Sequence, residues 1–289
     1  MKSTETVFIT ECPRDAMQGI GAFIPTELKI EYLNQLLQVG FDRLDFGSFV
    51  SPKAIPQLRD TREVLDGLTL NSDTDLLAIV ANSRGATEAC EMKPISIIGF
   101  PFSVSETFQM RNTNKSIEES FVTVNEMIRI TSDANKNLLV YLSMAFGNPY
   151  GDAWDTGSVL SWIHKLKAAG IKKIALADTV GLASENNVKN LTKAVLDTFP
   201  DLEVGIHLHC EPGNWHSKVA AAYDAGCRRF DSAIKGFGGC PMAEDDLVGN
   251  LATEHIIQYL EQKNVETLIN KEQFGKALVA ADKIFLNYH

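Results

Sequence analysis

The residues best suited to chemistry are two histidines separated by one residue, His207 and His209. Alternate residues of a β-strand point to the same side, so a strand over residues 204–209 would aim both imidazoles at one place. Two imidazoles, with a carboxylate and an amide from elsewhere in the chain, make a site for a divalent metal ion. Asp15 can supply the carboxylate and Asn250 the amide oxygen. The sequence therefore predicts a six-coordinate ion with open positions for substrate oxygens.

The elements that must position these side chains are indicated by one pattern that recurs three times. A helical stretch stops at a glycine, a short basic or polar step follows, and an apolar strand then ends in a carboxylate. The copies cover residues 39–45, 169–178 and 225–231 and end in Asp45, Asp178 and Asp231. Glycine just past a helix supplies a left-handed cap, and the apolar run that follows is typical of a parallel strand. Because a (β/α)8 barrel places its chemistry at strand carboxyl ends, the pattern favours that fold.

Eight strands and several intervening helices are predicted along the chain. We expect the strands near residues 7–11, 43–48, 75–81, 94–99, 138–145, 173–178, 202–209 and 229–234. We expect helices after Pro25-Thr26, Ser51-Pro52 and Ser184-Glu185, from a capping box at Ser116, over residues 158–169, and from Asn250 nearly to the end. The sequence thus predicts one α/β domain over residues 1–289, a (β/α)8 TIM barrel with additional C-terminal helices from about residue 250.

The bulk composition bounds the class of protein. Of the 289 residues, 45% are hydrophobic and 22% are charged, the ordinary balance of a globular domain. The formal net charge of −10 gives no basic stripe for nucleic acid, and no apolar run approaches the length that spans a membrane. The five cysteines are scattered without a CxxC pair, and no signal or transit segment is visible. We therefore expect reduced thiols and a cytoplasmic protein.

Each candidate residue also has an ordinary structural interpretation. The Arg14-Asp15 pair could be a surface or capping pair, and Gly249-Asn250 could be a turn. The two histidines could be core residues with satisfied hydrogen bonds. Because a barrel would bring all of these pieces to one rim, the metal-site hypothesis is favoured over the separate interpretations.

Several motifs together make the chain resemble a known family. They are Pro13-Arg14-Asp15 with Gln18, Ser48-Phe49-Val50-Ser51-Pro52-Lys53, Ser105-Glu106, Pro149-Tyr150, Asp178-Thr179, His207-Leu208-His209, Gly238-Gly239-Cys240-Pro241 and Gly249-Asn250 through Glu254. The chain resembles the 3-hydroxy-3-methylglutaryl-CoA lyases, in the metal-dependent lyase and Claisen-type group of TIM barrels. The resemblance runs from about residue 11 to past residue 254. It implies a carbon–carbon lyase that cleaves 3-hydroxy-3-methylglutaryl-CoA to acetyl-CoA and acetoacetate, as in leucine degradation or ketone-body formation.

The resemblance also implies roles for individual residues. Asp15, His207, His209 and Asn250 would bind Mg²⁺ or Mn²⁺. The catalytic residues would be Arg14, Asp178, Cys240 and His207. Arg14 would face the thioester carbonyl that becomes an enolate, Asp178 would act as base or base relay, and Cys240 would assist proton delivery. The remaining residues would bind substrate or lie behind the ligands: Gln18 and Ser48 at the acyl group, Arg111 and Asn112 at CoA, and Asp45 and Glu254 as support. The expected partner is an acyl-CoA, and the expected assembly a homodimer or higher homo-oligomer.

Departures from the family pattern keep alternatives open. Cys210 stands where an Asp commonly follows the second histidine, Thr10 where a Glu is common, and Asn148 where a Cys is frequent. The substrate could therefore be a related 3-hydroxyacyl-CoA. An acetyl-CoA-dependent Claisen-type synthase of the same barrel group is a second hypothesis. A scaffold with core histidines or structural Zn²⁺ is a third, and a Cys–His hydrolase using Cys240 is a fourth.

Overall fold

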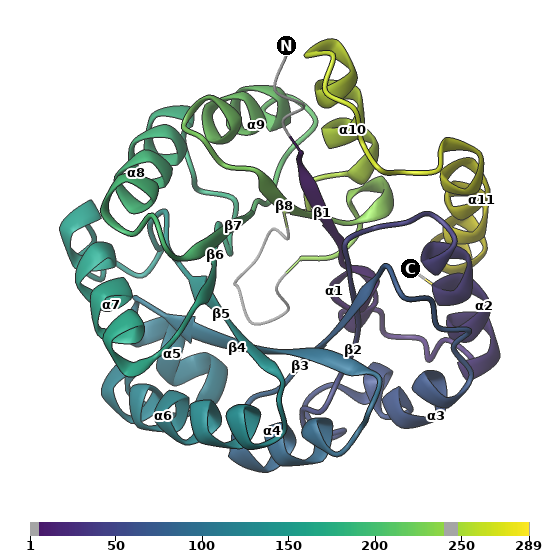
Figure 1. Ribbon diagram of the computed structural model, residues 1–289, viewed down its shortest axis with the longest axis horizontal. Coiled ribbons are helices and arrows are strands. Elements are labelled where there is room, and N and C mark those ends of the chain that lie inside the picture. The colour runs from purple at the N-terminus through teal and green to yellow at the C-terminus, as the bar shows by residue number, and fades with distance from the viewer. Residues whose placement is uncertain (1–5, 240–247, 289) are drawn as a thin grey trace.

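Eight parallel strands close into a barrel in the order of the sequence (Figure 1). This computed structural model describes residues 6–239 and 248–288. The strands are β1 (Phe8–Glu11), β2 (Arg43–Ser48), β3 (Asp75–Ile79), β4 (Ile95–Ser103), β5 (Asn137–Ser143), β6 (Lys173–Ala177), β7 (Glu203–His207) and β8 (Arg229–Ser232). The predicted fold and all eight predicted strands are confirmed. Several strands differ in extent: β4 runs on to Ser103, past the expected end, whereas β3, β5, β7 and β8 each end two residues before the expected end.

A ring of helices surrounds the barrel (Figure 1). In chain order these are α1 (Pro13–Gln18), α2 (Thr26–Leu37), α3 (Thr61–Asp66), α4 (Ser83–Cys90), α5 (Glu106–Thr113), α6 (Ile117–Asp133), α7 (Thr156–Ala169), α8 (Glu185–Thr198), α9 (Trp215–Asp224), α10 (Thr253–Gln262) and α11 (Lys271–Tyr288). Two 3₁₀ turns, η1 (Pro56–Leu58) and η2 (Ile234–Gly236), lie between them. The predicted capping box is present, with Ser116 and Glu119 bonded reciprocally.

One predicted helix is wrong. Ser51-Pro52 does not open a helix: Ala54 N and Ile55 N both donate to Ser51 O, which makes an isolated turn. A second proline, Pro56, then begins the η1 turn, and α3 starts only at Thr61. A proline cannot donate its backbone nitrogen and clashes with the preceding turn, so two prolines four residues apart restrict this segment to short turns.

The three glycines of the recurring pattern adopt the predicted left-handed conformation. The φ angles are +85° at Gly40, +115° at Gly170 and +105° at Gly226. Only glycine enters this region without a steric cost, so each of these positions ends its helix and turns the chain into the next strand. The three carboxylates that follow are all buried: Asp45 is 1%, Asp178 is 2% and Asp231 is 3% exposed.

The C-terminal helices are as predicted, and α11 packs beside α2, as Figure 1 also shows. The rings of Tyr32 and Phe285 meet edge to face at 6.1 Å. Phe285 also stacks on Phe237, in the loop after β8, at 4.3 Å. The C-terminal helix therefore supports a loop of the barrel rim as well as the outer helix ring.

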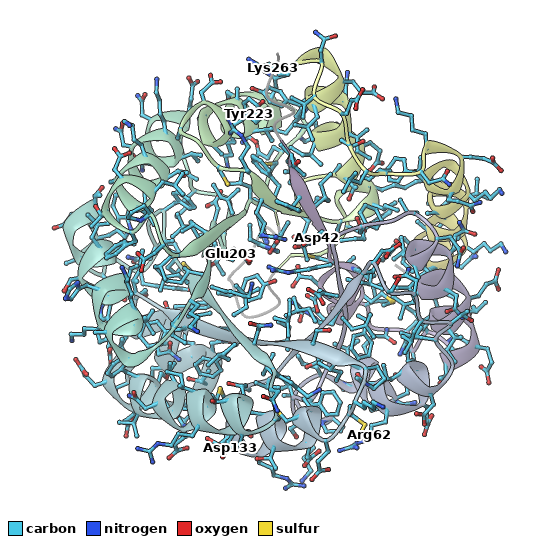
Figure 2. All side chains as sticks on the ribbon, in the orientation of Figure 1. Asp42, Arg62, Asp133, Glu203, Tyr223 and Lys263 are labelled. Carbon is cyan, nitrogen blue, oxygen red and sulfur yellow. The ribbon has the colours of Figure 1, made fainter. Side chains whose placement is uncertain are left out.

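The inside of the barrel is filled by side chains. Apolar residues from β3, β4, β5 and β6 form an interior cluster of Leu77, Ile79, Ile97, Leu139, Tyr141 and Ala175. At the amino-terminal end, Arg43 pairs with Glu203 at 2.7 Å, and Arg229 contacts both Asp42 and Glu203. Figure 2 labels Asp42 and Glu203 near the middle of the barrel in this view. Because this end is occupied by an ion-pair network, chemistry is left to the opposite rim. No helix in the described part of the chain is long and apolar enough to span a bilayer.

Candidate active site and metal centre

The four predicted metal ligands converge at the carboxyl-terminal rim. His207 ends β7, and its Nε2 lies 3.3 Å from Nε2 of His209. His209 lies outside the strand, but it forms an antiparallel bridge with Asn250, so its side chain still faces His207. The Asn250 Nδ2 donates to Asp15 Oδ2 at 2.8 Å. All four residues are at most 8% exposed.

The arrangement fits a hard divalent cation. Ligand atoms of Asp15, His207 and His209 lie within 4.8 Å of one another. The 3.3 Å between the two Nε2 atoms is close to the roughly 3 Å that separates neighbouring ligands of an octahedral ion with bonds of about 2.1 Å. The Asn250 Oδ1 is buried and has no hydrogen-bond partner among the described residues. An orphaned amide oxygen beside a carboxylate and two imidazoles suits Mg²⁺ or Mn²⁺.

The protonation states of His209 and Asp15 favour ligation, whereas a proton on His207 would compete with the ion. Burial, with the charge of His207 beside it, lowers the pKa of His209 to about 4, so this imidazole is neutral at pH 7. Burial opposes the charged form of His207, but Asp231 and Asp15 outweigh it and raise its pKa above the usual value. Burial likewise opposes ionisation of Asp15, yet Arg14 and the two histidines hold its pKa below the usual range. Asp15 is thus an ionised ligand.

Arg14 is fixed between two carboxylates. Its Nε and Nη2 contact Asp45 Oδ2 at 3.0 and 2.6 Å, and its Nη1 donates to Asp15 Oδ1 at 2.9 Å. The same Nη1 donates to Gln18 Oε1 at 2.9 Å. Burial raises the pKa of Asp45 to about 6 although Arg14 opposes the shift, so Asp45 is ionised at neutral pH. The guanidinium is therefore held as an oriented positive charge beside the ligands.

A cavity of about 170 Å³ opens directly over these groups. The polar residues that line it at the candidate metal centre are Arg14, Asp15, Gln18, Tyr141, Ser143, Thr179, His207 and His209. Its outer part is lined by Asn112 and Thr113 from α5 and by Val50, Ala54 and Ile55 from the segment after β2. The cavity therefore joins the candidate metal centre to an apolar entrance, as a site for a small polar group on a longer arm would require.

Besides Asn250 and Asp45, which are described above, four of the predicted residues do not line this cavity. Ser48 accepts a hydrogen bond from Val50 N and lines a separate depression. Arg111 lies over the Tyr150 ring, with 4.6 Å between its Cζ and the ring centroid. Glu254 accepts from Lys235 N at 2.9 Å and supports the loop after β8. Asp178 is the fourth and is described next. Cys240, predicted to deliver a proton, lies outside the described residues.

Asp178 faces away from the barrel interior. Alternate residues Ala175, Ala177 and Thr179 point inward, and the last two line the cavity. Asp178 has the opposite parity, and its Oδ1 accepts from Ala183 N while its Oδ2 accepts from Lys218 Nζ at 2.8 Å. Both carboxylate oxygens are engaged outside the cavity, so the geometry does not bring Asp178 to a substrate hydroxyl.

Sequence reasoning missed three residues of the site as functional. Asp231 Oδ2 lies 3.4 Å from Nδ1 of His207 and orients that imidazole from behind. It is the third carboxylate of the recurring pattern, which was a usable signal. Tyr141 meets the His207 ring edge to face at 6.0 Å and lines the cavity. Lys218, on α9, is 2% exposed and gave no signal, because a helical lysine is ordinarily at the surface.

Glu11, at the end of β1, forms hydrogen bonds with the segment after β8 that carries the ligand Asn250. It is fully buried, and it accepts hydrogen bonds from Ile234 N at 2.8 Å and from Thr253 Oγ1 at 2.6 Å. Burial raises the pKa of its carboxyl to about 8 in spite of these donors. Because Thr253 lies three residues after Asn250, Glu11 holds the segment after β8 close to α1 and Asp15.

Together, fold and site define a class: a (β/α)8-barrel enzyme with a candidate divalent-cation site at its carboxyl-terminal rim. The sequence matches the HMGL-like family model over residues 6–279, so the chain belongs to the HMGL-like family.

Curated relatives and solved structures match nearly the whole chain. The chain is 34% identical to the hydroxymethylglutaryl-CoA lyase of Bacillus subtilis over 92% of this chain and 88% of that protein. It is 32% identical to the human mitochondrial hydroxymethylglutaryl-CoA lyase over 92% of this chain and 81% of that one. Among solved structures, an HMG-CoA lyase from Acinetobacter baumannii in complex with coenzyme A and 3-methylmalate superposes with a TM-score of 0.91 at 32% identity, over 98% and 92% of the two chains.

Proposed function

We propose that the chain is a divalent-metal-dependent carbon–carbon lyase that cleaves 3-hydroxy-3-methylglutaryl-CoA to acetyl-CoA and acetoacetate. The observation that supports it best is the convergence of Asp15, His207, His209 and Asn250 beneath a cavity that also holds the guanidinium of Arg14. The match to the HMGL-like family and to lyases of that name supports the same activity.

The reaction breaks the bond between carbons 2 and 3 of the acyl group. The proton of the 3-hydroxyl is removed, that oxygen becomes the ketone of acetoacetate, and the electron pair of the broken bond passes to carbon 2. The resulting thioester enolate then takes up a proton and becomes acetyl-CoA. The site must therefore supply a base, a stabiliser of negative charge on the thioester oxygen, and an acid.

Asp15, His207, His209 and Asn250 would hold the cation, with Mg²⁺ and Mn²⁺ as the candidates. The ion would make the substrate hydroxyl more acidic and orient the substrate oxygens. The buried Asp231 would keep the His207 ring in place from the opposite side.

Arg14 would stabilise the enolate. Its guanidinium lies at the cavity wall and is fixed by Asp45, so it needs no reorganisation when charge develops on the thioester oxygen. A guanidinium donates charge-assisted hydrogen bonds, which strengthen as the oxygen becomes an anion. Gln18, bonded to both Arg14 and Asp15, would hold the two groups in register.

Asp15 replaces Asp178 as the proposed acceptor of the hydroxyl proton. Asp15 is the one carboxylate among the described residues that line the cavity, whereas Asp178 is turned away and bonded to Lys218. The proposed proton donor to the enolate carbon is the Cys240 thiol, an assignment that rests on the resemblance of the Gly238-Gly239-Cys240-Pro241 motif.

The CoA tail is proposed to leave the cavity past α5. Asn112 and Thr113 line this side of the cavity, and Arg111, one residue earlier, lies over Tyr150. We do not expect Ser48 to contact the acyl group, because it lines another depression and its Oγ accepts a hydrogen bond from Val50 N. We further expect the chain to act in the cytoplasm as a homodimer or higher homo-oligomer.

Product analysis tests the proposed activity. The chain, stripped of metal and then supplied with Mg²⁺ or Mn²⁺, should convert 3-hydroxy-3-methylglutaryl-CoA into equal amounts of acetyl-CoA and acetoacetate. A chain that is inactive on this thioester but condenses acetyl-CoA with an oxo acid would be a synthase and would contradict the proposal. Activity that is unchanged by a chelator would contradict the metal dependence.

A further inference from the structure

A buried lysine lies directly behind the candidate metal centre. The side chains of Lys218 and Asp178 are each 2% exposed. The Lys218 Nζ donates to Asp178 Oδ2 at 2.8 Å, to Gly181 O at 3.0 Å and to the backbone carbonyl of His209 at 2.9 Å. An ammonium has three protons, and all three are directed to acceptors here.

These bonds join three separate segments of the fold. Lys218 belongs to α9, Asp178 and Gly181 follow β6, and His209 follows β7. Asp178 also accepts a hydrogen bond from Ala183 N, in the segment just before α8, at 3.0 Å. The ammonium is therefore a junction between two rim loops and the helix outside them.

The end of β7 and the segment after it, which Lys218 contacts through the His209 carbonyl, carry the predicted ligands His207 and His209. On its other side His209 pairs with Asn250, with Cys210 N bonded to Gly249 O and Leu251 N to Leu208 O, each at 2.9 Å. Since β7 already ends at His207, no ladder of the barrel fixes the backbone at His209. Its position depends on Lys218 on one side and on the Asn250 segment on the other.

We infer that Lys218 is a positioning residue for the metal centre, which holds the backbone of His209, and through it Asn250, at the place where the cation binds. The inference rests on the proposed metal-dependent function and gives Asp178 a purpose that its orientation allows. Asp178 neutralises the buried ammonium and keeps it aimed at the His209 carbonyl. Removing a supporting partner of a metal ligand typically weakens metal binding about 10- to 100-fold.

A second buried lysine provides a matched control. The side chain of Lys29 is also 2% exposed, and it pairs with Asp60 at 2.8 Å and donates to the carbonyl of Gln57. It joins α2 to the η1 segment and contacts none of the four ligands. Lys29→Met therefore removes the same kind of buried ion pair without touching the metal centre.

The test is Mn²⁺ binding to the chelator-stripped chain, measured by calorimetry for the wild type, Lys218→Met and Lys29→Met. We expect Lys218→Met to raise the Kd for Mn²⁺ at least about tenfold, and Lys29→Met to leave it within twofold although both variants unfold at lower temperature. At saturating Mn²⁺ the kcat of Lys218→Met should recover most of the wild-type value. A Lys218→Met variant that binds Mn²⁺ as tightly as wild type overturns the inference.

A second variant tests the inference if Lys218→Met alone does not fold. Lys218→Met combined with Asp178→Asn removes both buried charges, a change that proteins tolerate better than the loss of one partner. The same weakening of Mn²⁺ binding is expected, and wild-type affinity would overturn the inference. If the wild type itself binds no Mn²⁺, the proposed metal site is wrong. If the wild type and the variant bind Mn²⁺ equally, only the positioning role of Lys218 is wrong.

Discussion

Arg14 and Asp45 form a buried ion pair in which the guanidinium Nη2 lies 2.6 Å from Oδ2 and Nε lies 3.0 Å from the same oxygen. Asp45 is in β2 and Arg14 in α1, so the pair fixes the Arg14 guanidinium relative to the barrel wall. A positioned charge stabilises a developing anion far better than a mobile one, because it needs no rearrangement during the reaction. The orientation of Arg14 therefore depends on a residue that does not line the cavity.

Replacing that carboxylate should affect turnover more than metal binding. We expect Asp45→Asn to lower kcat about 100-fold, since a misplacement of the order of 1 Å has effects of this size. The Kd for Mn²⁺ should stay within about threefold, because Asp45 contacts none of the ligands. Steady-state kinetics beside Mn²⁺ titration measure both quantities. Wild-type kcat in Asp45→Asn would show that Arg14 needs no such support.

Gly238 is the position where a small side chain would disturb the ligands most directly. Its φ is +102°, and a Cβ there would lie 2.6 Å from Asn250 Nδ2 and 2.9 Å from the backbone oxygen of Asp15. We expect Gly238→Ala to separate these ligands and weaken Mn²⁺ binding more than tenfold. The measurement is Mn²⁺ titration of the stripped protein.

Gly170 supplies the control for backbone strain. Its φ of +115° is similar, but a Cβ there would meet Ile128 only at 3.8 Å, and it lies just before β6, at the end of the barrel opposite the site. Gly170→Ala should cost stability through its backbone alone and leave the Kd for Mn²⁺ unchanged. Equal Mn²⁺ binding by both alanine variants would contradict the predicted collision.

Glu11 should make the stability of the fold depend on pH. Its pKa is about 8 in the folded chain against an ordinary value of 4.5, so between these values the folded state holds a proton that the unfolded chain releases. The free energy of unfolding should therefore fall as pH rises from about 4.5 to 8, by on the order of 2 kcal/mol between pH 6 and 8. Glu11→Gln should remove this part of the slope, because the amide mimics the protonated carboxyl.

Urea unfolding at pH 5 and pH 8.5, in chelator, measures the difference. Glu11→Gln should be more stable than wild type at pH 8.5 and similar to it at pH 5. Glu266→Gln, at an exposed position after α10, should follow the wild-type slope. An unchanged slope in Glu11→Gln would mean that Glu11 is ionised in the fold at neutral pH.

Cys240 tests the proposed proton delivery. If its thiol protonates the enolate carbon, Cys240→Ser should lower kcat by at least about 100-fold, because an alcohol is a much weaker acid than a thiol. Mn²⁺ affinity should not change. Unaltered kcat would leave this position without a chemical role.

The barrel was predictable because its signals are local. Each glycine cap at residues 40, 170 and 226 ends a helix and begins a strand within a few residues, and apolar runs mark the strands. The end of β7 was not predictable in the same way. His209 leaves the ladder because Asn250, 41 positions later in the sequence, replaces a barrel strand as its partner.

The site was predicted where residue type alone determines chemistry, as in Asp15 and the two histidines. Asp178 shows where this fails, because its carboxylate is at a strand end but has the outward parity. The alternation of Ala175, Ala177 and Thr179 carries that information. Lys218 could not be found from sequence, since its burial depends on contacts with two loops that precede it.

The most direct measurement of the central claim is a titration of the chelator-stripped chain with Mn²⁺, followed by electron paramagnetic resonance, for the wild type and Asp15→Asn. The wild type should bind one Mn²⁺ per chain with the signal of imidazole nitrogen coordination, and Asp15→Asn should weaken that binding about 100-fold, since it removes the charged ligand. Absence of a bound ion in the wild type, or equal binding by Asp15→Asn, would contradict a metal centre built by Asp15, His207, His209 and Asn250.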